Sequence, residues 1–402
     1  MTASDMFPPL TKRLVSNIRD MRRTLFEDEH IWFRESVREF AQRELAPARE
    51  EHRRRHGIGR EAWLAAGKSG LLSVPLPVDM GGAGGDFRFN AVMGEELARA
   101  GLAYASSFGI HTDVVAPYLL ELTDADQRER WLPGFASGET VTAIGMTEAE
   151  AGSDLASLRT RAVPDGDGWI LSGGKTFITN GASADLTVVA ARTGERRTDI
   201  SLFAVEKGTA GFSQGEPLAK VGQPEADTAE LFFEDARLPA HALLGEAGRG
   251  FAYMMERLPQ ERLSATFANL GHTAAALDNT LAYVMDRRAF GQPIGTFQNS
   301  RFALAEARTA VDVAFAFADR CLAEHVAGRL DPIDAAKAKW WSAEVQNRVI
   351  DSCVQLHGGY GYMDEYDIAR AWTDARVTKI WAGSNEIMKE VIGRDLGLGD
   401  PR

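Results

Sequence analysis

The sequence predicts an α+β chain of three domains, with helices first, β-strands second and helices again last. The chain has 402 residues, enough for two or three packed domains. Apolar residues recur at helical spacing before residue 141 and after residue 246, whereas the segment between consists of short β-rich runs and turn residues. We therefore expect an N-terminal helical domain at 1–140, an antiparallel β-barrel or sandwich at 141–246 and a C-terminal four-helix bundle at 247–402.

Composition and charge exclude several classes of protein. The 57 acidic and 45 basic side chains give a net charge of -12, whereas a nucleic-acid binder needs a basic face. We predict no membrane span, because no run approaches about 18 consecutive apolar residues. Cys321 and Cys353 lack the paired spacing of a metal site, so we expect buried thiols, no metal and a reducing compartment.

The first residues are basic between Lys12 and Arg23, as in a mitochondrial transit peptide. Asp5 and Asp20 weaken that interpretation, and Pro8-Pro9 interrupts any amphipathic helix. We therefore expect a ragged leader before the first helix, and a bacterial cytoplasmic protein rather than one of the mitochondrial matrix.

The N-terminal domain begins with a helix from Asp28, whose apolar positions are Trp32, Val37, Phe40 and Leu45. We expect an exposed basic turn at 53–55, and further helices around Trp63, at 91–100 and at 114–122. The clearest strands of the middle domain are 169–171, 176–179, 186–189, 200–205 and 230–233. Turn residues at 165–168, 172–174 and 180–181 separate some of these runs and predict hairpins.

Four helical segments follow Gly248. The first has Pro259 at a first-turn position, where a missing N–H costs nothing. The second spans about 299–327, the third about 332–357, where Gly358-Gly359 ends it, and the fourth 365–377. A short last helix follows Ser384, a typical N-cap residue.

Glu261 stands near the start of the first of these helices, off its apolar stripe. Its helical neighbours Ala265 and Ala268 are small, which leaves room for a cavity beside the carboxylate. The alternative is a solvated glutamate, favoured at a helix start by the helix dipole.

Four strings of residues resemble the acyl-CoA dehydrogenase family along nearly the whole chain, from about Phe26 to Leu396. They are Met146-Thr147-Glu148 with 151–154, then 177–181, 287–291 and 355–361. Within the family the chain is most similar to the long-chain enzymes, through residues 227–235 and 258–263. The resemblance implies FAD-dependent oxidation of an acyl-CoA to a trans-2-enoyl-CoA, with a base that takes the proton next to the thioester carbonyl and a hydride that passes to flavin N5.

The resemblance also implies which residue is the base. Most family members carry a glutamate in the loop before the last helix, where this chain has Ala382. The long-chain and isovaleryl branches carry it on a bundle helix immediately before an arginine, and Glu261-Arg262 matches that position. We therefore predict Glu261 as the base, with a pKa raised by burial. Arg262 is either a surface charge or a group that holds the site around the thioester.

The resemblance assigns the cofactor contacts as well. Met146 and Thr147 are expected against the flavin ring, with Phe177 covering the ring and Thr179 reaching N5. Core packing in the β-domain is the alternative for Phe177. Ser153 is expected near the pyrophosphate or CoA, in a loop where Ala149-Glu150 replaces the usual Pro-Gly. The resemblance places further contacts to the FAD, several from a neighbouring subunit, at Arg287, Phe290, Gln298, Gln355, Gly358, Gly359, Ser384 and Glu386.

The remaining expectations are also those of the resemblance. Arg262, Gly383 and Ser153 are expected on the substrate side. For Arg287 the alternative is a plain surface arginine. For Gly358-Gly359 the alternative is a mere helix terminator. The implied partners are an acyl-CoA, an electron-transferring flavoprotein and three further copies in a homotetramer. Alternatives are a short branched-chain (isovaleryl-type) dehydrogenase, a flavin oxidase or monooxygenase on the same fold, and a non-catalytic subunit.

Overall fold

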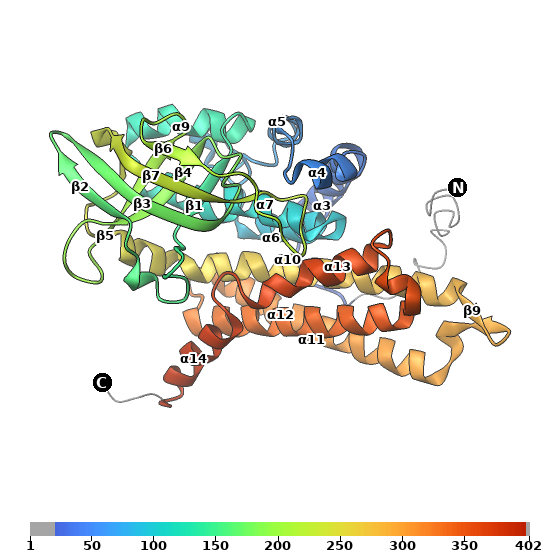
Figure 1. The fold of residues 1–402 in the computed structure, drawn as a ribbon. Helices are drawn as coiled ribbons and strands as arrows, with labels where there is room; N and C mark the ends of the chain where they lie inside the picture. Colours follow the sequence, from blue (N-terminus) through green and yellow to red (C-terminus); the bar gives the residue numbers. More distant parts are fainter. Residues whose placement is uncertain (1–20, 399–402) are drawn as a thin grey trace.

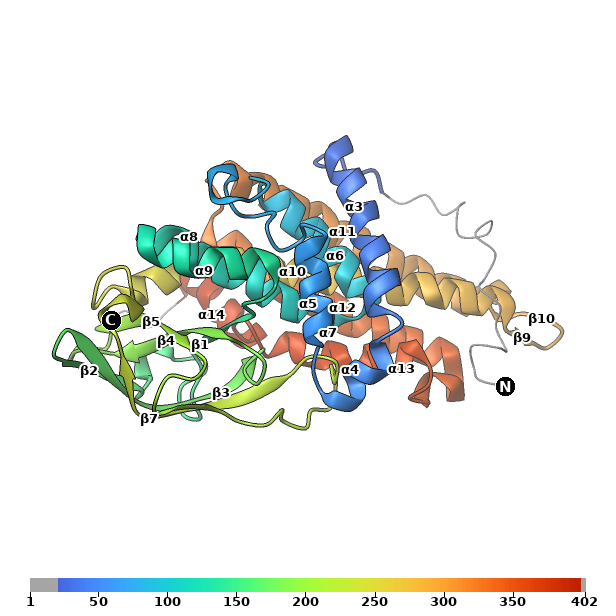
Figure 2. The same cartoon turned by 90° about the horizontal axis from the view of Figure 1, so that it is seen from above.

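A computed structural model describes residues 21–398, and its arrangement confirms the predicted fold class (Figure 1). Helices of the N-terminal region and a mixed β-sheet lie along one side of a long helical bundle, as the second view also shows (Figure 2). Residues 1–20 of the predicted leader lie outside the described residues. No helix among residues 21–398 is long and apolar enough to cross a bilayer.

The N-terminal region is helical throughout, with two π-helical segments. Its main elements are α3 (Asp28–Phe40), the π-helix η1 (Ala41–Leu45), α4 (Arg49–Arg55), α5 (Arg60–Lys68), α6 (Phe87–Ala100), α7 (Leu102–Gly109), the π-helix η3 (Ile110–Val115), α8 (Ala116–Leu122) and α9 (Ala125–Ser137). Two predictions here are wrong. Of the predicted apolar positions, Val37, Phe40 and Leu45 are buried, but Trp32 is 66% exposed and does not belong to the buried face of α3.

The basic turn predicted at 53–55 is instead the end of α4. The helix tolerates its clustered arginines because Arg49 and Arg53 both form ion pairs with the buried carboxylate of Glu225, at 3.0 and 3.4 Å. The helix therefore attaches the N-terminal region to the segment that enters the last long strand.

The middle domain is built on an eight-stranded sheet in the order β6-β7-β3-β2-β4-β5-β8, with β1 beside β4. The strands are β1 (Thr142–Gly145), β2 (Arg161–Asp165), β3 (Gly168–Thr179), β4 (Leu186–Arg192), β5 (Ile200–Glu206), β6 (Phe212–Gln214), β7 (Thr228–Leu238) and β8 (Leu243–Leu244). The predicted hairpin at 165–168 is confirmed, because β2 pairs with β3 across it. Pairing is mostly antiparallel as predicted, except that β4 runs parallel to β1 and β2.

The hairpin turn predicted at 172–174 is wrong. Strand β3 continues through these residues, and its pairing with β7 shifts register between Leu171 and Gly173. Gly173 has a φ of +138°, and a Cβ there would lie 2.7 Å from the Cα of Thr160. The glycine therefore permits a bulge and a close crossing of β2, and not a reversal of the chain.

The bundle contains three long helices and two short ones. They are α10 (Gly250–Asp286), α11 (Gln298–Val326), α12 (Pro332–His357), α13 (Asp367–Ala375) and α14 (Asn385–Asp395), and a hairpin of β9 (Arg288–Ala289) and β10 (Gln292–Pro293) joins the first two. The predicted ends of the second and third helices are confirmed within one residue, but the fourth helix is short. Cys321 and Cys353 are buried and unpaired, as predicted.

The predicted start of the first bundle helix is wrong. Helix α10 begins at Gly250 and contains Pro259 in its interior. A proline there removes one helical hydrogen bond. Burial of Met254 on one side of it and Leu263 on the other offsets that cost, since both side chains are fully buried.

Arg23 connects the N-terminal region to the bundle. Its Nη1 donates to Glu95 of α6 at 2.7 Å and its Nε donates to Asp319 of α11 at 2.8 Å. The guanidinium also stacks over the ring of Phe315 at 4.4 Å. The last basic residue of the predicted leader is therefore a packed part of the fold.

Candidate active site

Glu261 lies on α10 and faces the segment that runs from η3 into α8. Tyr118 of α8 is fully buried, and its hydroxyl donates a hydrogen bond of 3.2 Å to Oε1 of Glu261. The two residues stand 143 positions apart in the sequence. The fold therefore places a carboxylate against a single phenol where α10 packs against the N-terminal region.

Burial raises the pKa of Glu261 to about 7. The hydrogen bond from Tyr118 and the positive charges of Arg262 and Arg257 act in the opposite direction, but they are outweighed. The prediction of a raised pKa is confirmed, and the alternative of a solvated glutamate at a helix start is wrong. The helix begins about two turns earlier than the sequence suggested, so Glu261 lies within the helix and not in its first turn, and its side chain is half-buried.

Arg262 is buried as well, with 8% of its surface exposed, so the alternative of a surface charge is wrong. Its Nε has no hydrogen-bond partner among the described residues. Burial lowers the pKa of the Arg262 guanidinium, which leaves a partly unsatisfied cation beside Glu261. Such a group is suited to bind an anionic or carbonyl oxygen.

Lys339 connects the surroundings of Arg262 with the loop before α14. Its fully buried Nζ donates to the carbonyl oxygen of Gly383 at 2.5 Å. Burial and the neighbouring charge of Arg262 lower the pKa of Lys339 to about 8. The predicted substrate residues Arg262 and Gly383 are thus both neighbours of one lysine, the first through its charge and the second through a hydrogen bond.

The predicted flavin residues of the β-domain are brought together around β3. The backbone N–H of Thr176 donates to the carbonyl oxygen of Thr147 at 3.0 Å, which places Met146 and Thr147 beside the end of β3 that carries Phe177 and Thr179. Phe177 is 68% exposed, so the core-packing alternative is wrong. An aromatic ring with an uncovered face fits a planar isoalloxazine ring.

A buried ion pair supports this edge of the sheet. Lys175 donates to Glu148 at 2.7 Å and to the carbonyl oxygen of Met146 at 3.3 Å. Glu148 and Ala151 exchange backbone hydrogen bonds of 3.0 and 3.1 Å, so Ala149-Glu150 still forms a tight turn. Ser153 follows this turn and is exposed.

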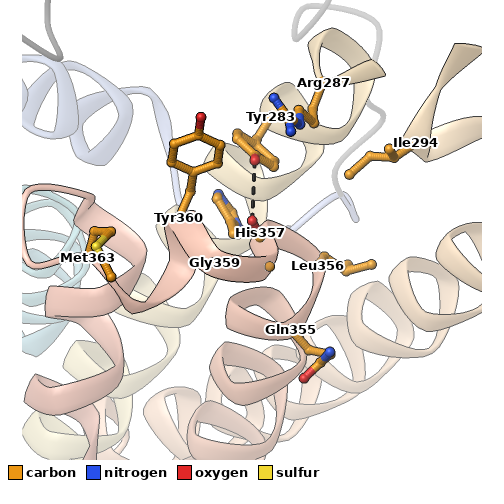
Figure 3. Close-up of a pocket in the computed structure, with 10 residues that line it drawn as sticks. Tyr283, Arg287, Ile294, Gln355, Leu356, His357, Gly359, Tyr360 and Met363 are labelled. Atoms are coloured by element: carbon orange, nitrogen blue, oxygen red, sulfur yellow. Dashed lines mark hydrogen bonds between the residues drawn. The ribbon is translucent and has the colours of Figure 1, made fainter. Parts of the chain in front are cut away.

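A pocket of about 500 Å³ lies where α10 and α12 end. It brings together the predicted residues Arg287, Gln355, Gly358 and Gly359, and Figure 3 shows Arg287 and Tyr283 facing the turn after α12. No described carboxylate pairs with Arg287, which stacks over Tyr360 at 5.3 Å. An unpaired arginine beside glycines suits a pyrophosphate.

One glycine of this pocket has a backbone conformation that favours glycine over other residue types. Gly358 has a φ of +61°, a conformation that side chains disfavour, and no atom lies within 4 Å of the position of an added Cβ. The backbone is therefore open to a ligand. Gly358 is also the C-cap of α12, so the helix-terminator alternative is confirmed. Ending the helix does not prevent a ligand from approaching the same backbone.

The remaining predicted cofactor residues lie apart from Phe177. Phe290 is 95% exposed at the tip of the β9–β10 hairpin, and Gln298 begins α11 next to it. This hairpin projects from the end of the bundle opposite the β-domain (Figure 1). One chain therefore does not bring the residues of 287–298 to the ring-binding residues of β3. Ser384 is the N-cap of α14, as predicted, with Glu386 exposed in its first turn.

Sequence reasoning missed three parts of the site: Tyr118, Lys339 and Asp113, the last of which accepts hydrogen bonds from Gln260 and Ser264 on the two sides of Glu261. Tyr118 lies within a predicted helix, but nothing in its neighbourhood links it to Glu261. Lys339 and Asp113 are ionisable residues within apolar helical runs, and that mismatch was the one available signal.

Sequence models of the three acyl-CoA dehydrogenase domains match this chain in order. The N-terminal domain matches residues 27–139, the middle domain 143–236 and the C-terminal domain 248–397. Together these matches account for most of the chain.

Individual relatives agree with the domain matches. The long-chain specific acyl-CoA dehydrogenase of Rattus norvegicus mitochondria is 47% identical, over 93% of this chain and 88% of its own. The mitochondrial isovaleryl-CoA dehydrogenase of Arabidopsis thaliana is 35% identical, over 92% of each. The crystal structure of an acyl-CoA dehydrogenase from Geobacillus kaustophilus superposes with a TM-score of 0.91 at 43% identity, over 93% of this chain and 100% of its own.

The family also fixes the cofactor. A glutaryl-CoA dehydrogenase from Mycobacterium smegmatis, 27% identical with a TM-score of 0.88 over 94% of this chain and 97% of its own, was solved with FADH2. The exposed ring of Phe177 and the pocket at Arg287 are compatible with such a cofactor. This chain belongs to the acyl-CoA dehydrogenase family, and it is an FAD-dependent oxidoreductase of that family.

Proposed function

We propose that this protein dehydrogenates a long-chain acyl-CoA, straight or branched, to the trans-2-enoyl-CoA, with Glu261 as the base. One observation carries the proposal: Glu261 is a carboxyl group inside the site whose pKa is raised to about 7, in a chain that has alanine at position 382. A base with a pKa near the working pH is both ionised and basic enough to take a weakly acidic proton. The similarity to long-chain enzymes supports the choice of substrate.

In the proposed reaction, Glu261 takes the proton from the carbon next to the thioester carbonyl. The electron pair of that C–H bond becomes the second bond of the new double bond, while the neighbouring carbon loses a hydride. Bound FAD supplies the hydride acceptor. Glu261 ends the step as a neutral carboxylic acid, which the desolvation of this carboxyl group favours. Arg262, together with Gly383 and Ser153, is proposed to bind the thioester end of the substrate.

Met146, Thr147, Phe177 and Thr179 would hold the flavin ring against β3. Ser384 and Glu386 are assigned to the adenosine side, as the family resemblance implies. Arg287, Phe290, Gln298, Gln355, Gly358 and Gly359 are assigned to the FAD of a second copy, because in one chain the hairpin projects away from the β-domain. This assignment supports a homo-oligomer, and we propose a tetramer.

We further propose that the reduced enzyme passes its electrons to an electron-transferring flavoprotein. One solved relative is described as the electron transferring flavoprotein of Acidaminococcus fermentans, which associates this fold with such electron transfer. The competing activity is that of an oxidase or monooxygenase, in which the reduced flavin reacts with oxygen directly. Rapid oxygen consumption by the substrate-reduced enzyme would favour that activity.

The decisive experiment is an anaerobic titration of the purified protein with a panel of acyl-CoA thioesters. The panel contains butyryl-, isovaleryl-, octanoyl- and palmitoyl-CoA, and loss of the oxidised-flavin absorbance is recorded. We expect the long-chain thioesters to bleach the flavin at the lowest concentrations. Bleaching by isovaleryl-CoA alone would replace long-chain by short branched-chain specificity, and no bleaching by any thioester would contradict the proposal.

A further inference from the structure

Tyr118 has an unusually restricted environment for a hydroxyl group. The side chain is fully buried in the apolar cluster formed by η3, α8 and the β-domain. Oε1 of Glu261 is its one hydrogen-bond partner among residues 21–398. The buried hydroxyl of Tyr118 therefore makes its hydrogen bond to the proposed base.

The ring of Tyr118 is fixed from behind by Arg257 of α10. The guanidinium of Arg257 lies 4.9 Å from the ring centroid, and its own nitrogens donate to the carbonyl oxygen of Tyr253 at 2.9 Å and to Glu121 at 2.6 Å. Arg257 is itself buried. The phenol consequently has little freedom to turn its hydroxyl away from Glu261.

The helical turn around Glu261 is held by the same segment of chain. The side chain of Gln260 donates to the carbonyl oxygen of Asp113 at 2.7 Å, and the hydroxyl of Ser264 donates to the Asp113 carboxyl at 2.5 Å. Asn90 and Thr112 also donate to Asp113, at 2.8 and 2.7 Å. The π-helix η3 thereby anchors the residues on both sides of Glu261, while Tyr118 holds its side chain.

We propose that Tyr118 is the positioning residue of the base: it occupies Oε1 of Glu261 and leaves Oε2 as the oxygen that receives the proton. No described residue donates a hydrogen bond to Oε2. The proton of the C–H bond is transferred to Oε2, and the Tyr118 O–H bond stays intact throughout. This inference rests on the proposed function, since it concerns the same proton.

The proposal has a measurable consequence for the acidity of Glu261. The hydroxyl of Tyr118 stabilises the ionised carboxylate, so its removal makes ionisation harder. The other charged groups facing the site are Arg257 and Arg262 on α10, with Glu121 of α8 paired to Arg257. None of these side chains is altered by removal of a phenol hydroxyl.

The test compares Tyr118→Phe with Tyr104→Phe. Tyr104 is also fully buried and bonded through its hydroxyl, but to His52 at 3.1 Å within the N-terminal domain. The rate of anaerobic flavin reduction by saturating long-chain acyl-CoA is measured from pH 5 to 9, a range set to bracket a midpoint of about 7. We expect the midpoint to rise by about one pH unit in Tyr118→Phe and to stay unchanged in Tyr104→Phe.

Equal midpoints in Tyr118→Phe and the unmodified protein would overturn the assignment of Tyr118 alone. Failure of the unmodified protein to be reduced by any acyl-CoA would overturn the proposed function, and this inference with it. If Tyr118→Phe does not fold, 3-fluorotyrosine is placed at position 118. Its more acidic hydroxyl donates more strongly, so the midpoint should fall. The same replacement at position 104 should change nothing, and an unchanged midpoint at 118 would again overturn the assignment.

Discussion

Lys339 donates a hydrogen bond to the carbonyl oxygen of Gly383, and this contact holds the loop before α14, one of the two places where the family resemblance led us to expect a base. The loop itself holds no carboxylate, since Ala382 stands at that place. Ala382 nonetheless keeps a left-handed backbone with a φ of +51°, followed by Gly383 at +80°. The loop conformation is therefore set by its anchor on α12 and does not depend on a catalytic side chain at 382.

Substitution of Ala382 by glycine should stabilise the protein slightly. A side chain in the left-handed region costs roughly 1–2 kcal/mol, of which glycine's greater freedom in the unfolded chain cancels part. We expect the free energy of unfolding to rise by up to ~1 kcal/mol, measured by thermal or chemical denaturation. Ala369→Gly within helix α13 is the control, and it should lower stability by about 0.5–1 kcal/mol.

Substitution of Glu261 by glutamine should abolish flavin reduction while leaving FAD bound. The amide keeps the shape of the side chain but cannot accept the proton, so the rate should fall roughly a hundred- to ten-thousand-fold. Stopped-flow absorbance after anaerobic mixing with acyl-CoA measures it. Glu256→Gln, an exposed site on the same helix, should reduce normally. Unimpaired reduction in Glu261→Gln would exclude this residue as the base.

The rate of flavin reduction should rise with pH through about 7. Glu261 must be ionised to act, and its pKa is raised to about 7 by burial, so below that pH the rate should fall about tenfold per pH unit. The free energy of unfolding should fall as the pH rises through the same range. The neutral acid is favoured by the folded state, so its contribution is complete below the unfolded pKa and is lost as the pH rises through 7. Melting temperatures of the unmodified protein and Glu261→Gln should diverge over that range.

Substitution of Arg287 by alanine should weaken FAD retention. The substitution removes the guanidinium at the pocket, and with it the hydrogen bonds proposed to reach the pyrophosphate of FAD. Hydrogen bonds to charged groups are each worth about 1.5–3 kcal/mol. We expect the dissociation constant for FAD to rise roughly tenfold or more, measured by fluorescence of released flavin. Arg288→Ala is the matched control, because Arg288 bonds the carbonyl oxygen of Gly291 within the hairpin. Equal flavin loss in the two variants would contradict the role of Arg287.

Substitution of Lys175 by methionine should destabilise the β-domain. It leaves Glu148 buried without its ammonium partner at 2.7 Å, and breaking such a pair costs about 3–5 kcal/mol. Replacing both partners, as Lys175→Met with Glu148→Gln, should recover part of the loss because no uncompensated charge remains. Thermal denaturation followed by circular dichroism compares the three proteins. A double variant less stable than Lys175→Met would argue against a charge effect.

Periodicity predicted the elements that are decided locally. Helices α11 and α12 begin and end within one residue of the predicted limits, because their ends coincide with capping and breaking residues such as Asp331 and Gly358. Prediction failed where packing overrides local preference. Pro259 is tolerated inside α10, and β3 passes through a glycine pair that resembles a turn.

The candidate site was predictable where one residue decides the chemistry. Glu261 could be found because the sequence lacks an alternative at Ala382, and its partial burial follows from the contacts of α10 with η3 and α8. Tyr118 could not be found, because hydrogen bonding across 143 residues leaves no trace in local spacing. Its contribution depends on the angle at which two helices meet.

The contact of Arg23 with Asp319 has a consequence for synthesis on the ribosome. The two residues are 296 positions apart, so Arg23 has left the exit tunnel long before Asp319 is translated. At about 5–20 residues per second, that interval lasts roughly 15–60 s. During this interval Arg23 lacks its partner Asp319 on α11. A nascent chain that ends before Asp319 should therefore be cut readily by proteases near Arg23.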